Sequence, residues 1–83
     1  MKLELDQLRN WVAAYLGRLL LIDPGQIDLR KSLEDFGLDS VDALIMAGEL
    51  EEHFHIEIEP SVLFEFGTLH DMIEAWGRGE KSP

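Results

Sequence analysis

The chain has 83 residues, of which 46% are hydrophobic, so it can form one small domain with a modest core but not two domains. Seventeen acidic residues against seven basic ones give a net charge of −10. This charge opposes binding to nucleic acids and to anionic membrane surfaces, and it favours partners with basic patches. The absence of cysteine excludes disulfides, thiolate zinc sites and a thiol nucleophile in the chain.

The sequence shows no targeting or membrane segment. No stretch reaches the roughly 20 apolar residues of a membrane span, and the N-terminus lacks the pattern of a secretory signal peptide. We therefore expect one cytoplasmic, monomeric domain over residues 1–83. It should be ordered from about residue 3 to 77, with a polar, frayed tail over 78–83.

The first predicted element is a helix from about Leu3 or Asp6 to Leu20. Apolar residues recur at spacings of three and four, which places them on one stripe of a helix. The stripe consists of Leu5, Leu8, Val12, Tyr15, Leu16 and Leu19. Trp11 lies at its edge. The pattern covers too few heptads for a coiled coil, so it indicates a helix packed by one face into a bundle.

A long connection follows from Leu21 to Asp39, where the helical periodicity stops. Asp23, Pro24 and Gly25 form a cluster that breaks the helix. We expect a loop with one short turn near Ser32 to Phe36, because Ser32 and Asp35 have the spacing of a capping box. Its apolar anchors should be Ile22, Ile27, Leu29, Leu33 and Phe36.

The most informative predicted element is a helix from Ser40 to about Phe54. Asp39 can act as its N-cap, with Asp42 completing an arrangement close to a capping box. Ser40 then lies in the first turn with its hydroxyl unused, because its neighbour already provides the cap. The sequence therefore predicts an exposed attachment point at Ser40 and not a buried nucleophile.

This helix has two apolar stripes where a surface helix needs one. At about 100° per residue, the core stripe consists of Ala43, Met46, Ala47, Leu50 and Phe54. The opposite stripe, bordered by carboxylates, is predicted to contact partner proteins, and the residues involved are Val41, Asp42, Leu44, Ile45, Gly48, Glu49, Glu51 and Glu52. An alternative is that the loop or the next helix covers part of this stripe, Leu44 in particular.

The rest of the chain predicts short elements. His55 to Glu59 alternates apolar and acidic residues, but without a partner strand we expect a loop with Ile56 and Ile58 pointing inward. Pro60 suits the start of a short helix to about Phe66, closed by Gly67. Thr68, with Asp71, caps a last helix to about Trp76. The predicted fold is an all-α, small four-helix bundle with three longer helices, one short helix and a long loop between the first two helices.

Catalytic and metal sites are poorly supported. The residues around Ser40 lack the glycines of a nucleophile elbow. His53 and His55 point to different sides of a helix end, and Asp35, Asp39 and Asp42 do not match the spacing of a calcium loop. We therefore expect no enzyme activity and no metal site.

The chain closely resembles the acyl carrier proteins of fatty-acid and polyketide synthesis. The similarity covers nearly the whole chain, and its most specific part is Gly37, Leu38, Asp39, Ser40 and Val41 followed by Glu49, Leu50, Glu51, Glu52 and Phe54. The resemblance implies that Ser40 carries 4'-phosphopantetheine from coenzyme A and holds acyl intermediates as thioesters. The implied partners are a phosphopantetheinyl transferase, a ketosynthase, an acyltransferase or acyl-activating ligase, and other synthase enzymes with basic docking patches.

Two departures favour a polyketide-type carrier. Val41 stands where family members commonly have leucine, and Ile45 stands where fatty-acid carriers often have an acid. Asp39 argues against the peptidyl carriers of nonribosomal synthesis. The alternative to a carrier is a non-catalytic acidic helical module that binds other proteins without a prosthetic group, which would not explain the placement of Ser40.

Overall fold

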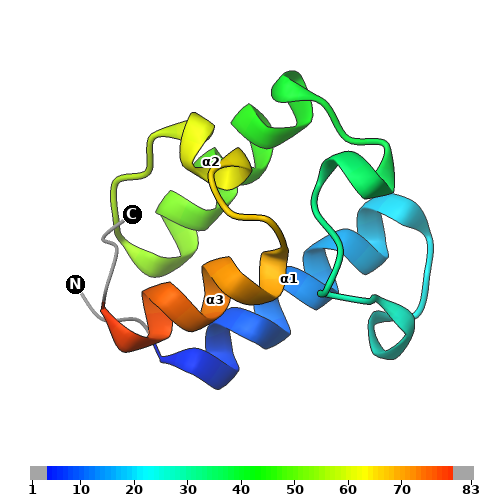
Figure 1. The fold of residues 1–83 in the computed structure, drawn as a ribbon, viewed down its shortest axis with the longest axis horizontal. Coiled ribbons are helices and arrows are strands. Elements are labelled where there is room, and N and C mark those ends of the chain that lie inside the picture. Colours follow the sequence, from blue (N-terminus) through cyan, green and yellow to red (C-terminus); the bar gives the residue numbers. More distant parts are fainter. Residues whose placement is uncertain (1–3, 80–83) are drawn as a thin grey trace.

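Three α-helices surround one hydrophobic core in the computed structural model, which describes residues 4–79. The helical elements in chain order are α1 (Leu5–Leu20), η1 (Pro24–Gln26), η2 (Glu34–Phe36), α2 (Ser40–Phe54), η3 (Pro60–Phe64) and α3 (Leu69–Arg78), where η marks a short 3-10 helix. Helices α1 and α3 lie side by side, and η3 packs against α2 (Figure 1). Within residues 4–79 there is no strand. The predicted all-α bundle is confirmed, and its short fourth helix is the 3-10 helix η3.

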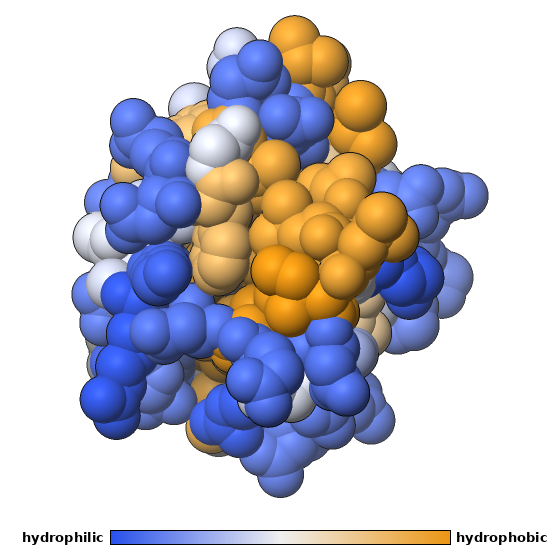
Figure 2. Space-filling model, turned by 90° about the vertical axis from the view of Figure 1, so that its right-hand side faces the viewer, coloured by the Kyte–Doolittle hydropathy of each residue, from blue (hydrophilic) through white to orange (hydrophobic). Residues whose placement is uncertain are grey.

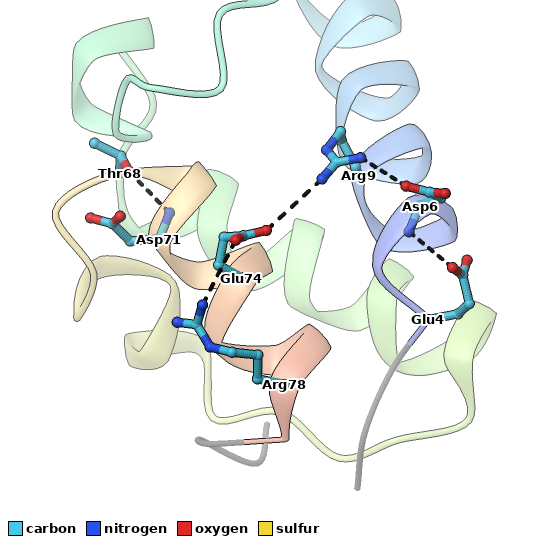
Figure 3. A network of polar contacts seen from close by, with 7 residues as sticks. All are labelled: Glu4, Asp6, Arg9, Thr68, Asp71, Glu74 and Arg78. Atoms are coloured by element: carbon cyan, nitrogen blue, oxygen red, sulfur yellow. Dashed lines mark hydrogen bonds and ion pairs between the residues drawn. The ribbon is translucent and has the colours of Figure 1, made fainter.

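Side-chain caps fix where the first and last helices begin. The Glu4 carboxylate accepts hydrogen bonds from the backbone N–H groups of Asp6 and Gln7 at 3.2 and 2.8 Å. At the start of α3, Thr68 Oγ1 accepts one from the Asp71 N–H at 3.1 Å, as predicted (Figure 3). First-turn N–H groups have no partner inside the helix, so each cap supplies a bond that the helix itself cannot make.

The core is formed largely by the predicted stripes. The members from the α-helices are Leu8, Val12, Leu16, Ala43, Met46, Ala47, Leu50, Leu69, Met72, Ile73, Ala75 and Trp76, to which η3 adds Leu63 and the loops add Leu33 and Ile58. The assignment of Leu19 to the core stripe is wrong, because its side chain is exposed. Near the end of α1 the buried residue is instead Gly17. A Cβ at this position would lie 2.7 Å from the Ile22 carbonyl oxygen and 3.2 Å from Pro24.

The long connection contains the predicted turn. The Asp35 N–H donates to Ser32 Oγ at 3.2 Å and the Ser32 N–H donates to the Asp35 carboxylate at 3.0 Å, which confirms the capping box ahead of η2. Leu33 is buried, whereas the expected anchor Ile22 is exposed. Helix η1, which begins at Pro24, was not predicted. The chain folds back over Gly17 directly after α1, with the backbone of Ile22 against the helix and its side chain exposed.

Backbone hydrogen bonds tie this connection to the far helix. The Leu69 N–H donates to the Lys31 carbonyl at 3.0 Å, and the His70 N–H donates to the Leu29 carbonyl at 2.7 Å. Both donors belong to the first turn of α3. The loop therefore satisfies groups that α3 cannot satisfy within itself.

The last helix is longer than predicted, since it continues past Trp76 to Arg78 and is capped by Gly79 in the left-handed conformation. Gly77 is buried, and a Cβ at this position would lie 2.6 Å from Leu5 Cδ1 of α1. Glu74 adds ion pairs of 3.8 Å to Arg78 and 3.9 Å to Arg9 (Figure 3). Residues 78 and 79 are thus a helix end and not a frayed tail. The remaining tail, residues 80–83, and the alternative helix start at Leu3 lie outside the described residues.

Candidate functional site

Ser40 is the first residue of α2, and its side chain is exposed. The Asp39 carboxylate accepts hydrogen bonds from the N–H groups of Val41 and Asp42 at 3.0 and 3.1 Å, and the Asp42 carboxylate accepts one from the Asp39 N–H at 3.1 Å. This reciprocal pair is a complete capping box. Because Asp39 and Asp42 cap the helix, the hydroxyl of Ser40 is not needed for the cap, and within residues 4–79 it makes no hydrogen bond.

The turn before α2 brings Ser40 to the surface. Helix η2 ends at Gly37, whose φ of 79° lies in the left-handed region that glycine adopts without strain. The Leu38 N–H then donates to the Leu33 carbonyl at 3.1 Å, and Leu38 packs against the core. The chain is therefore anchored two residues before Ser40, so the serine stands at a fixed helix start.

The cap also affects the acidity of Asp39. The hydrogen bond from the Asp42 backbone N–H is the main reason that the pKa of Asp39 lies below its ordinary value, and the bond from the Val41 N–H lowers it further. The contribution of this carboxylate to the stability of the fold is therefore present in full above the unfolded-state pKa of about 3.9. It is lost as the pH falls through the lower folded-state pKa.

We expect the thermal midpoint of the wild type to exceed that of Asp39→Asn at neutral pH, with a margin that shrinks below about pH 4, since protonation removes the charge in both proteins. Thermal melts followed by circular dichroism between pH 7 and pH 2 measure this margin. A margin that stays constant down to pH 2 would show that the charge of Asp39 does not stabilise the helix.

The second apolar stripe of α2 is exposed along its length. Val41, Leu44 and Ile45 are 60, 58 and 55% exposed, and Gly48 is exposed as well. The alternative in which the loop or the next helix covers Leu44 is therefore wrong. Figure 2 shows a broad apolar area on the side of the molecule where α2 begins and α1 ends. An apolar area of this kind on a small acidic protein is typical of a protein interaction site.

The acidic residues of α2 occupy three different positions. Glu52 is exposed on the same side as the apolar stripe, given about 100° per residue. Glu51 lies on the flank towards η3, where its carboxylate accepts the Ile58 N–H at 2.8 Å and holds the following loop. Glu51 thus has a structural contact that the sequence did not predict, because it joins residues seven positions apart.

Asp42 and Glu49 lie on the other flank, facing α1. Burial is the main reason that the pKa of Tyr15 is raised, and the carboxylates of Glu49 and Asp42 raise it further. Glu49 also lines a shallow groove of about 310 Å³ together with Tyr15, Arg18 and Leu19 of α1. The predicted partner-binding residues therefore extend from Ser40 along α2, and Asp42 and Glu49 adjoin part of α1.

Leu21 is an exposed residue that the sequence analysis did not assign to any site. It ends α1 in the left-handed conformation, with φ 58° and ψ 45°, and its side chain is 91% exposed. The signal was available in the sequence, because glycine is the usual residue after the last turn of a helix and leucine stands there instead.

The histidines form no metal site with the nearby acids. Within residues 4–79 there is no group of three or more histidine, aspartate or glutamate side chains placed to hold a metal ion. His53 instead lies edge-on to Phe54, with ring centroids 4.7 Å apart, and near Trp11 at 6.1 Å. None of the helices in this part of the chain is long and apolar enough to cross a membrane.

A small all-α bundle that presents an exposed serine at a capped helix start defines a class of protein, the carrier domains. The family model described as a phosphopantetheine attachment site matches residues 10–76, so the chain belongs to this family. Its members are carriers and not catalysts, and their prosthetic group is covalently attached 4'-phosphopantetheine. The resemblance to acyl carrier proteins that the sequence suggested is thereby confirmed.

Relatives of two sizes share this domain. The chain is 31% identical over 67 residues to the polyketide synthase PksM of Bacillus subtilis, covering 81% of this chain and 2% of that protein. It is 33% identical over 64 residues to an acyl carrier protein of Phytoplasma mali, covering 76% of each. The chain therefore spans a small fraction of the polyketide synthases and most of the length of the carrier protein.

The fold agrees with solved carrier structures. An acyl carrier protein from Anabaena sp. PCC 7120 with a variant phosphopantetheinylation-site sequence superposes with a TM-score of 0.81 at 25% identity, over 94% of this chain and 90% of that one. A free-standing peptidyl carrier protein from Acinetobacter baumannii has a TM-score of 0.78 at 23% identity, over 94 and 98% of the two chains. The second likeness concerns the fold alone.

Proposed function

We propose that Ser40 is the attachment residue and that the chain carries acyl intermediates of polyketide synthesis as thioesters. The observation that supports Ser40 is its exposed hydroxyl at the start of α2, where Asp39 and Asp42 already make the cap. A helix start also favours a phosphate, because its N–H groups and dipole attract negative charge. The bound group supplies the thiol that a chain without cysteine lacks.

In the loading step Ser40 is the nucleophile, and a separate transferase catalyses the reaction. Ser40 Oγ bonds to the phosphorus of the phosphopantetheine, the pyrophosphate linkage of coenzyme A breaks, and adenosine 3',5'-bisphosphate leaves. The hydroxyl proton passes to a base of the transferase or to water. A mass increase on the peptide that contains Ser40, after incubation with coenzyme A and a phosphopantetheinyl transferase, tests this assignment.

Partner enzymes are proposed to dock on α2. Val41, Leu44, Ile45 and Gly48 provide apolar contact area, and Asp42, Glu49 and Glu52 provide negative charge around it. Glu51 adds charge from the flank where it holds the loop. The partners are the transferase, a ketosynthase, an acyltransferase or acyl-activating ligase, and other synthase enzymes with basic patches. We further propose one non-catalytic, monomeric carrier domain over residues 1–83 that acts in the cytoplasm.

If the carboxylates steer these enzymes, the kcat/KM of the transferase should fall as salt rises. Exposed charges lose most of their reach beyond a Debye length of about 8 Å at physiological ionic strength. Glu52→Gln and Asp42→Asn should lower kcat/KM at low salt and flatten its salt dependence. Glu52→Gln is the cleaner variant, because the Asp42 carboxylate also accepts the Asp39 N–H. Initial rates of loading over a series of sodium chloride concentrations measure the effect.

Glu57→Gln provides the matched control for this series. It removes the same charge from the exposed loop after α2, at the opposite end of that helix from Ser40. We expect its salt dependence to follow the wild type. A flat response of the wild type, or an equal loss in Glu57→Gln, would mean that the charge of α2 serves solubility and that docking depends on the apolar stripe.

A further inference from the structure

The end of α1 exposes a second group of large apolar side chains, which we call the Leu21 patch. It consists of Leu19, Leu21 and Ile22, and Leu21 is the most exposed of them at 91%. None of the three belongs to the stripe on α2. A leucine at this position has two unfavourable features, since its side chain meets water and its backbone adopts a left-handed conformation that L-residues with a Cβ avoid.

The turn that carries Leu21 is well bonded. The N–H groups of Leu21 and Ile22 both donate to the Gly17 carbonyl, the second at 2.9 Å. Gly17 is buried under this turn, and a Cβ there would lie 2.7 Å from the Ile22 carbonyl oxygen. The side chain of Leu21 is thus held outward by a fixed turn. A glycine at position 21 would form the same turn without either unfavourable feature.

The Leu21 patch adjoins α2 through Leu19. Leu19 and Glu49 line the same groove between α1 and α2, and Ile45 lies one helical turn before Glu49. The apolar area in Figure 2 extends over the side of the molecule where these two helix ends lie. A partner that covers the start of α2 would therefore reach the end of α1 across a groove that Tyr15, Arg18 and Glu49 line together with Leu19.

We propose that the Leu21 patch is a contact surface for the phosphopantetheinyl transferase. This inference rests on the proposed function, and the transferase is chosen for a geometric reason. All partner enzymes are proposed to dock on α2, but enzymes that act on the acyl group react with the end of a long arm, whereas the transferase must reach the hydroxyl of Ser40 itself. Its footprint therefore has to include the surface around the start of α2. A second copy of the chain is disfavoured as the occupant, because each copy carries a net charge of −10.

The test compares Leu21→Gly with His55→Gly. Within residues 4–79, Leu21 and His55 are the two residues apart from glycine that lie in the left-handed region, and His55 has a φ of 57°. His55 caps α2 at the end opposite Ser40. Both variants remove an exposed side chain and relieve the same backbone strain. We expect Leu21→Gly to lower the transferase kcat/KM by about five- to tenfold, as for an apolar contact residue at an interface. His55→Gly should load like the wild type.

Binding is measured separately from chemistry on the Ser40→Ala background. Titration of the transferase, with coenzyme A bound, should give a dissociation constant about five- to tenfold higher when Leu21→Gly is added. Unchanged binding and loading of Leu21→Gly, or equal losses in the His55→Gly control, would overturn the proposal. Failure of the wild type to gain mass at any enzyme concentration would instead contradict the proposed function, while the binding titration still decides the patch.

Discussion

Ser40→Ala is expected to abolish covalent loading while leaving the fold unchanged. The hydroxyl of Ser40 is exposed, and the hydrogen bonds that begin α2 come from Asp39 and Asp42. Substitution of an exposed residue away from caps and the core changes stability by about 0.5 kcal/mol or less. The variant should therefore show the wild-type circular dichroism spectrum and thermal midpoint, but no mass increase with coenzyme A and a phosphopantetheinyl transferase.

Ser61→Ala is the matched control for loading. Ser61 is also exposed and also lies at the start of a helical segment, in η3. It should gain the same mass as the wild type at the same rate. Loading of Ser40→Ala would refute the assignment of Ser40. A wild type that is never loaded would leave the alternative of an acidic interaction module without a prosthetic group.

Leu50→Ala is expected to produce the largest loss of stability. Leu50 is fully buried in the core stripe of α2, and truncation of a buried leucine to alanine costs about 2–5 kcal/mol. Domains of this kind are stabilised by only about 5–15 kcal/mol in total. Val41→Ala, on the opposite stripe and 60% exposed, should cost about 0.5 kcal/mol or less.

Urea unfolding followed by tryptophan fluorescence measures both variants, because Trp76 is fully buried in the same core. The midpoint should fall strongly for Leu50→Ala and little for Val41→Ala. Val41→Ala should instead raise the KM of the transferase, since it removes contact area next to Ser40. Equal destabilisation of the two variants would mean that the second stripe belongs to the core.

The start of α2 could be predicted from the sequence because its signals are local. Asp39 and Asp42 are three residues apart, and the structure has the capping box that this spacing indicates. The same holds for Ser32 with Asp35 and for Thr68 with Asp71. Apart from Leu19, the core stripes followed from the helical period. Local spacing thus sufficed for the starts of α2 and α3 and for the position of Ser40.

The features that the sequence did not predict depend on contacts between distant residues. Gly77 was predicted to follow the end of the last helix, yet it is a buried residue of α3 where this helix meets Leu5 of α1. Leu19 matched the core stripe, yet the groove beside Glu49 leaves it exposed. Glu51 appeared to be a surface acid until the loop placed the Ile58 N–H against it. Each outcome depends on where a second element lies, which periodicity does not encode.

The two hydrogen bonds between the long connection and α3 also determine which parts of the domain open together. If residues 29–31 detach from α3, the N–H groups of Leu69 and His70 lose their hydrogen-bond acceptors. The first turn of α3 is then less stable. Conversely, fraying of that turn releases the connection. Segments about forty positions apart in the chain are thus expected to form one cooperative unit in local unfolding, with their amide protons exchanging with solvent through a shared opening.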